Sequence, residues 1–351
     1  MRLTAVHHVV PLALIERARR LPVKGTVRVR VGQKVSAADT VASASWSRDH
    51  AFIDVASTLG ISPLAADNVL RFKAGDTVPA GVILAKSRGL LPKAVRAPRA
   101  GRVVAAGGGQ VLLESGESRL ELRAGISGVV REVDPDRGVV IETVGALVQG
   151  VWGNGRIDSG VMLNLADKSD MLLTPARMDV SMRGYILVGG QVHDADVLHT
   201  AAETAVRGLL IGSIFPSLLP LAREMRYPIV VTDGFGAVPM NSAAHRLIST
   251  NSKREATLNA EAFDRYTGAR PEVIIPLPGK TAPPLRDVAE VRAGQTVRLR
   301  REPHPGAIGT IVSLPAGAST YASGLSAPGA EVRLENGAQV LIPLVNLEVV
   351  G

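Results

Sequence analysis

The spacing of apolar and polar residues changes twice along the chain. As far as residue 150, short runs of Val, Leu and Ile alternate with turns that contain glycine, which is typical of β structure. Over 180–280, wholly apolar runs alternate with stretches of helical periodicity, and after a proline-rich stretch at 276–284 a period of two returns. We therefore predict a multidomain chain, divided into an N-terminal segment at 1–23 and domains at 24–155, 156–280 and 281–351.

Two internal repeats lie in the first domain. Residues 31–42 align with 74–85, and residues 97–104 align with 124–130. In each copy a glycine allows a turn and a valine begins the next strand. The repeats predict hairpin-like β structure rather than helix.

These repeats resemble the barrel-sandwich hybrid fold of biotinyl and lipoyl domains, in particular the version found in the Rnf electron-transport complex. The resemblance covers residues 24–150 and implies a compact β-sandwich with quasi-two-fold symmetry, which in carrier members bears a modified lysine at a hairpin tip. The Met-Lys-Met signature is absent, and the lipoyl-like string at 167–169 lies outside the repeats. We therefore expect a docking domain and no cofactor.

After these repeats, residues 138–143 are expected to form a buried strand. The glycine-rich stretch 145–155 that follows predicts either a tight loop or a place where another backbone approaches closely.

The middle of the chain predicts a small α/β domain. Apolar runs at 185–188, 209–211, 228–231 and 273–275 are expected to be strands, and residues 195–206 and 218–225 are expected to be helices. Fully apolar strands that alternate with helices indicate a parallel sheet covered on both faces.

The C-terminal part alternates with a period of two over 294–300, 306–312 and 330–350, and Asn336-Gly337 forms a turn signal, so we predict a small β-barrel. It resembles the KOW motif of SH3-like barrels at Pro303, Gly306, Gly309, Ile311 and Val312. The resemblance implies a surface that contacts RNA or protein.

Composition narrows the possible functions. Aromatic residues are 3% of the chain, which leaves few platforms for stacking bases, and the absence of cysteine excludes disulfides and thiolate chemistry. The net charge of +8 is compatible with a nucleic-acid partner. Neither a signal-peptide pattern nor an apolar run long enough for a membrane span is present, so we expect a cytoplasmic protein without membrane insertion.

Candidate ligand-binding residues follow the apolar strands of the α/β domain, because ligands bind beyond the carboxyl ends of parallel strands. A polar or anionic ligand could be held there by backbone amides, or Asp194 could simply cap a helix while the glycines permit turns. The polar string 251–259 is expected beside this edge as a phosphate contact or as a solvated loop or helix face. The candidates are Gly189, Gly190, Asp194, Ser213, Thr232, Asp233 and Gly234.

Candidate nucleic-acid contacts lie in the barrel, where Arg298, Arg300 and Arg301 precede His304. His7 and His8 form a pair, but with no carboxylate nearby in the sequence we expect no metal site. Nor does any set of residues have the spacing of a catalytic site.

Three hypotheses follow. The first is a non-enzymatic scaffold or accessory protein that docks protein partners through its β modules, with self-association through an exposed sheet edge left open. The second is RNA binding through the barrel, which predicts steep salt dependence. The third is a small-ligand-binding or enzymatic α/β domain.

Overall fold

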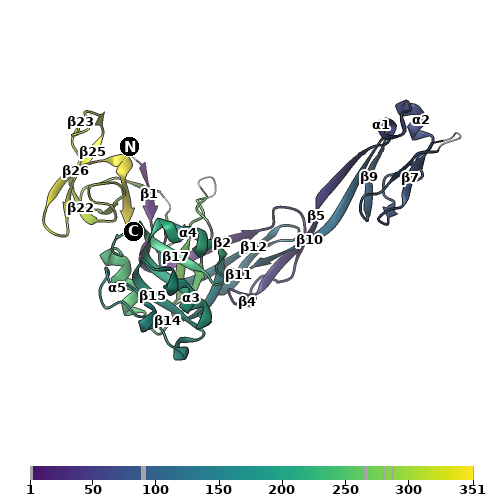
Figure 1. The fold of residues 1–351 in the computed structure, drawn as a ribbon. Coiled ribbons are helices and arrows are strands. Elements are labelled where there is room, and N and C mark those ends of the chain that lie inside the picture. Colours follow the sequence, from purple (N-terminus) through teal and green to yellow (C-terminus); the bar gives the residue numbers. More distant parts are fainter. Residues whose placement is uncertain (1–2, 88–91, 265–267, 280, 287, 351) are drawn as a thin grey trace.

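The structure is a computed structural model that describes residues 3–87, 92–264, 268–279, 281–286 and 288–350. The molecule is β-rich and elongated (Figure 1). A central body lies between a C-terminal module on one side and a long arm on the other, and the arm carries a small module at its far end. No helix among these described residues is long and apolar enough to cross a membrane.

The central body is built on one large mixed sheet. Strands β14 to β17 run parallel to their neighbours in the order β17-β16-β15-β14, and β18 and β19 then add antiparallel. The described strands of this sheet are β13 (Trp152–Gly153), β17 (Ile229–Phe235), β16 (Gly208–Ile214), β15 (Tyr185–Val192), β14 (Ile157–Asn164), β18 (Glu255–Asn259), β19 (Glu272–Pro276), β12 (Gly138–Gln149), β11 (Gly128–Asp134), β4 (Lys34–Val35) and β2 (Val9–Arg20).

The sequence predicted the parallel strands at 185–188, 209–211 and 228–231 correctly, but the parallel placement of 273–275 is wrong. That run lies in β19, which pairs antiparallel with both β12 and β18. A parallel neighbour needs a crossover connection, usually a helix, and the described part of 260–271 contains none.

Helices cover both faces of the parallel strands, as expected. The buried side chains of α3 (Ala195–Glu203) and α4 (Leu219–Glu224) pack with Leu187 and Leu209, whereas those of α5 (Ser242–Thr250) pack with Leu210 and Val230 on the opposite face. Successive residues of a strand point to opposite faces of the sheet, so in the fully apolar runs the side chains on both faces are buried under helices. The shorter helical turns are η1 (Pro175–Arg177), η2 (Val180–Met182), η3 (Pro216–Leu218) and η4 (Leu344–Asn346).

Two local expectations need correction. Residues 255–259 form β18, with Ala256 and Leu258 fully buried between β14 and β19, so this half of the polar string 251–259 is neither loop nor helix. Residues 145–149 continue β12, so they form no loop. The alternative prediction of close backbone approach is confirmed, since a Cβ on Gly145 would lie 2.3 Å from the Ile275 carbonyl oxygen.

The two repeats form two separate modules with the same strand pairing. In the proximal module (residues 26–42 and 122–141), β4 pairs with β11 and β11 with β12; in the distal module (residues 55–86 and 93–113), β6 pairs with β9 and β9 with β10. Each module has its own buried cluster, centred on residues such as Val35 and Val130 in one and Val78 and Val103 in the other. This differs from the single compact core that the resemblance implies for 24–155.

A two-stranded antiparallel arm joins the modules. β5 (Thr40–Asp54) and β10 (Gln110–Arg123) pair along their whole length, from Thr40 opposite Arg123 to Asp54 opposite Gln110. At about 3.3 Å per residue, fifteen residues of β5 extend roughly 50 Å. The other described elements of arm and distal module are β3 (Thr26–Val27), α1 (Val55–Leu59), α2 (Pro63–Asp67), β6 (Thr77–Val78), β7 (Ile83–Lys86), β8 (Ala94–Arg96) and β9 (Gly101–Gly107).

The C-terminal module is a sheet that takes one strand from the start of the chain. β1 pairs parallel with β27 and antiparallel with β20, so the expected N-terminal segment 1–23 is divided between this sheet and β2 of the central sheet. The predicted Asn336-Gly337 turn joins β25 to β26. Its described strands, in order, are β20 (Val288–Glu290), β1 (Leu3–His7), β27 (Leu347–Val350), β21 (Thr296–Leu299), β22 (Ile308–Ser313), β25 (Gly329–Leu334) and β26 (Gln339–Pro343), beside a hairpin of β23 (Ser319–Thr320) and β24 (Ser326–Ala327).

Candidate functional site

The expected ligand edge of the parallel sheet is partly covered by the chain itself. Gly189 and Gly190 near the end of β15 lie against residues 169–173, and a Cβ on Gly190 would be 2.4 Å from the Met171 carbonyl oxygen. These glycines therefore allow close packing of a neighbouring segment. They present no open loop to a ligand.

Asp194 caps α3. Its Oδ1 accepts a hydrogen bond of 3.0 Å from the Asp196 backbone N–H, as the capping alternative predicts. Ser213 on β16 is fully buried, and its hydroxyl has no hydrogen-bond partner among the described residues. Nε2 of His193 also has no hydrogen-bond partner among the described residues; the centre of the His193 ring lies 4.3 Å from that of the Phe215 ring.

Asp233 is the centre of a buried polar network at the end of β17. Its carboxylate accepts hydrogen bonds from the Thr232 hydroxyl (2.7 Å) and from the backbone and side-chain N–H groups of Asn241 (3.0 Å each). Asn241 in turn caps α5 by accepting from the Ala244 backbone N–H at 2.8 Å. Gly234 follows as the next residue of β17.

Arg298 joins this network from the C-terminal module. Its side chain is buried, its Nη2 donates to the Asp233 carbonyl oxygen, and the same atom lies 3.4 Å from Asp233 Oδ1. Its Nη1 lies 3.8 Å from Glu348 Oε2. The structure therefore brings together two residues that the sequence assigned to different sites, and it places Arg298 in an interface between modules, away from solvent.

Glu348 collects further charged groups. Arg270 Nη1 lies 3.4 Å and Arg300 Nε 3.6 Å from its carboxylate. Burial, followed by the positive charges of Arg298 and Arg270, lowers the pKa of His7 well below its usual value, so His7 is neutral at pH 7. The 3.9 Å between His7 Nδ1 and Glu348 Oε2 is therefore no ion pair. We call His7, Asp233, Arg298 and Glu348 the interface cluster; its members are buried, which suits a structural role.

The remaining predicted nucleic-acid contacts lie at the surface of the C-terminal module. Arg300 and Arg301 are exposed, and His304 is half-buried in the turn before β22. However, residues 281–351 contain six arginines and six acidic residues, so this part of the chain has no net charge. The basic strand that suggested RNA binding thus loses one cation to the interface and has its charge balanced by neighbouring acids.

A wide, open cavity of about 560 Å³ with a mixed polar and apolar lining lies between the carboxyl end of β14 and one side of α5. His245 on α5 is fixed there by a 3.1 Å hydrogen bond between its Nε2 and the Ala166 carbonyl oxygen. Asp167 and Arg246 give the wall one charge of each sign, which suits a polar ligand. Its lining is completed by Asn164, Ala166, Ser169, Ser242, Ser249 and Thr250.

Sequence reasoning missed this cavity because it did not identify β14. The signal was present in Val161-Met162-Leu163, an apolar run followed by Asn164 and, shortly after, by Asp167 and Ser169. Of the predicted ligand residues, none lines the cavity.

Neither a metal site nor a known relative provides a further lead. Across the described ranges, no group of three or more His, Asp or Glu side chains could hold a metal ion. No protein-family model and no curated protein matches the sequence.

Proposed function

We propose that this protein is a non-enzymatic, cytoplasmic scaffold that docks protein partners through β modules at its two ends. The observation that carries the proposal is that strands lead directly from one module into the next. β1 of the C-terminal sheet is separated from β2 of the central sheet by His8 alone, and the paired strands β5 and β10 run from the proximal to the distal module. β12 belongs to both the central sheet and the proximal module, and β10 belongs to both the arm and the distal module. Such pairing holds modules at a fixed separation, whereas a flexible linker would not.

The polar residues of the α/β part support this proposal, because they serve the fold. Asp194 caps a helix, and Asp233 fixes both α5 and the C-terminal module. As part of the proposal, we assign each repeat to a barrel-sandwich-like unit and the C-terminal module to the SH3-like barrels, two kinds of small β module that serve as docking domains.

Both ends of the molecule also expose large apolar side chains. Leu64 in the distal module is 76% exposed, and Val345 in the C-terminal module is 78% exposed. Exposed apolar residues of this kind suit a protein partner, since their burial is favourable. Val180, 83% exposed on the central body, offers a matched control position.

The test is site-specific photo-crosslinking in the cells that produce the protein. A photoreactive amino acid is placed at Leu64, Val345 or Val180, one position at a time, and crosslinked proteins are identified after a high-salt wash. We expect defined protein partners at Leu64 and Val345 and none at Val180. If the end positions capture no more than Val180 does, the scaffold proposal fails.

A second candidate function is binding of a small polar ligand, which the cavity beside α5 favours. Thermal unfolding measured with sugar phosphates, nucleoside monophosphates and dicarboxylates should then show a stabilising ligand. Arg246→Ala, which removes the cation of the cavity wall, should abolish the shift, while Arg223→Ala on α4 should leave it unchanged. Without a stabilising compound in these three classes, this candidate is rejected.

A further inference from the structure

The proximal and distal modules present the same set of cations at equivalent positions. We call Arg28, Arg30 and Arg123 the proximal triad, and Arg71, Lys73 and Arg96 the distal triad. Each copy makes the same backbone contacts: the Arg28 N–H donates to the Val41 carbonyl oxygen at 2.8 Å, and the Arg71 N–H donates to the Leu84 carbonyl oxygen at 2.9 Å. Arg123 lies opposite Thr40, and Arg96 lies opposite Ile83 in the same register.

The second member of each triad is equivalent as well. The Arg30 backbone N–H donates to Gln33 Oε1 at 3.2 Å, and the Lys73 backbone N–H donates to Asp76 Oδ2 at 2.8 Å. Each of these hydrogen bonds spans a turn, at residues 30–33 or 73–76, that directly precedes β4 or β6. The two triads are therefore copies of one arrangement rather than a coincidence of composition.

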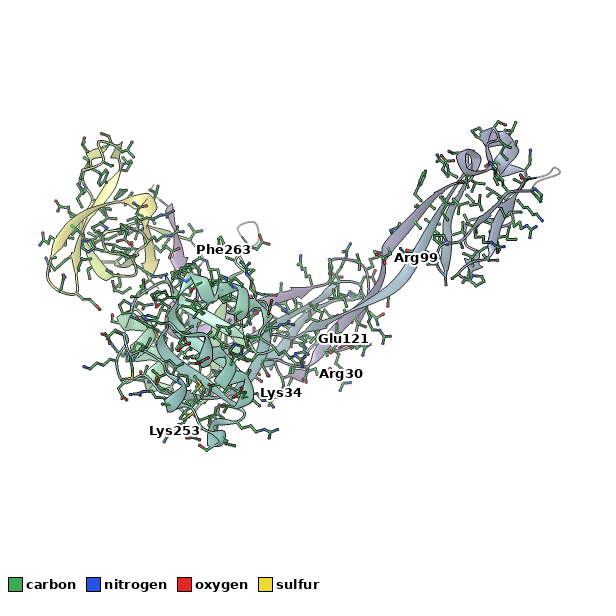
Figure 2. The ribbon with its side chains drawn as sticks, in the orientation of Figure 1. Arg30, Lys34, Arg99, Glu121, Lys253 and Phe263 are labelled. Atoms are coloured by element: carbon green, nitrogen blue, oxygen red, sulfur yellow. The ribbon has the colours of Figure 1, made fainter. Side chains whose placement is uncertain are left out.

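All six side chains point away from the module cores. The neighbours of Arg96, Val95 and Ala97, belong to the buried cluster of the distal module, and Leu70 and Phe72 on either side of Arg71 pack against it. In extended chain, residues that alternate with core residues face outward, and all six cations are exposed. Figure 2 shows Arg30 at the surface of the proximal module.

The cations of each triad lie close together. Arg71 and Arg96 flank the strand segment at Ile83 and Leu84 from opposite sides, which places their backbones about 10 Å apart, twice the spacing between strands. Lys73 is two residues from Arg71, about 7 Å along an extended chain. Each module therefore offers three positive charges on one outer face.

The fold does not account for these charges. Among the described residues, none of the six forms an ion pair with an acidic side chain; Arg28 donates to the Ser43 hydroxyl and Arg96 to the Gly81 carbonyl oxygen. The surplus charge of the protein also lies here. Residues 17–137 contain 20 basic and 11 acidic residues, a net charge of +9 against +8 for the whole chain.

We propose that the two modules bind the phosphate backbone of nucleic acid, each through its triad. This inference goes beyond the proposed scaffold function and does not depend on it. Exposed lysine and arginine side chains suit contact with phosphates, which is independent of base sequence. A shared membrane-binding role would need exposed apolar residues at equivalent positions of both modules. Val31 and Val129 are exposed in the proximal module, but the equivalent residues of the distal module are Ala74 and Arg102.

The test is binding of the full-length protein to a 30-base-pair duplex of mixed sequence, as DNA and as RNA, by fluorescence anisotropy at several salt concentrations. With six phosphate contacts, the plot of log affinity against log salt should have a slope of about −5.4, which corresponds to a loss of about 1,800-fold between 50 and 200 mM salt. Replacing either triad with alanine should make the slope shallower by about 2.7. Replacing both should remove most of the salt dependence.

The matched control replaces three exposed arginines outside the proximal and distal modules with alanine: Arg156, Arg183 and Arg333. It lowers the net charge by the same amount and should leave the slope unchanged. Circular dichroism of every variant checks that the fold is retained. A control that weakens binding as much as a triad variant, or the absence of binding to either duplex, overturns the proposal. So does binding to vesicles rich in phosphatidylserine that exceeds binding to both duplexes.

Discussion

Replacement of Arg298 by methionine tests the structural role of the interface cluster. The substitution keeps much of the aliphatic volume and removes the charge that lies between Asp233 and Glu348, which are 7% and 4% exposed. Removing one partner of a buried ion pair costs about 3–5 kcal/mol, because a charge is left without compensation. Here the lower end applies, since Asp233 keeps three hydrogen bonds and Glu348 keeps Arg270 and Arg300.

The assay is urea denaturation followed by circular dichroism, together with hydrogen exchange of the β21 and β27 amides. We expect the free energy of unfolding to fall by about 3 kcal/mol, and the two strands to lose protection because the C-terminal module is released from the central body. Arg333→Met, an exposed arginine of the same module, is the control and should change stability by less than about 0.5 kcal/mol.

A fall of less than about 1 kcal/mol for Arg298→Met, with unchanged protection in β21 and β27, would refute the burial of this ion pair. That outcome would return Arg298 to the surface role expected from the sequence.

Three further predictions concern the same regions. The pKa of His7 is depressed in the folded state, so below pH 6.5 the unfolded chain binds a proton that the folded chain does not. The free energy of unfolding therefore falls by up to about 1.4 kcal/mol per pH unit as acid is added, and His7→Phe should remove this contribution. Equal urea midpoints from pH 7.5 to 5.5 in the wild-type protein would contradict the prediction. Gly190→Ala should cost about 1–3 kcal/mol in the same titration, because the new methyl group meets the Met171 carbonyl oxygen. Asp194→Ala should cost about 1 kcal/mol through loss of the α3 cap, without changing any ligand-induced thermal shift.

Sequence reasoning worked where the signal was local. The repeats at 31–42 and 74–85 do form equivalent units, and the apolar runs after residue 185 do form parallel strands, because turns and periodicity depend on neighbouring residues. The Asn336-Gly337 turn is confirmed for the same reason.

What the sequence could not show depends on contacts between distant segments. The short strand β18 was missed because its polar flanks hide Ala256 and Leu258, which become buried only between β14 and β19. The repeats were expected in one core, since nothing in their pattern reveals that β5 and β10 hold them apart. Arg298 looked like a surface cation because its partner Asp233 lies 65 residues away in the chain.

The parallel pairing of β1 with β27 has a consequence for how the protein forms during synthesis. Ala5 pairs with Val288 and Val6 pairs with Val349, so about 280 residues must be added before β1 meets β20, and about 340 before it also meets β27 and has a neighbour on both sides. At 5–20 residues per second, the interval before β27 is made is roughly 20–70 seconds. β1 is unpaired until β20 has been made, and one of its edges stays open until β27 follows; an open strand edge is the kind of segment that associates with other chains.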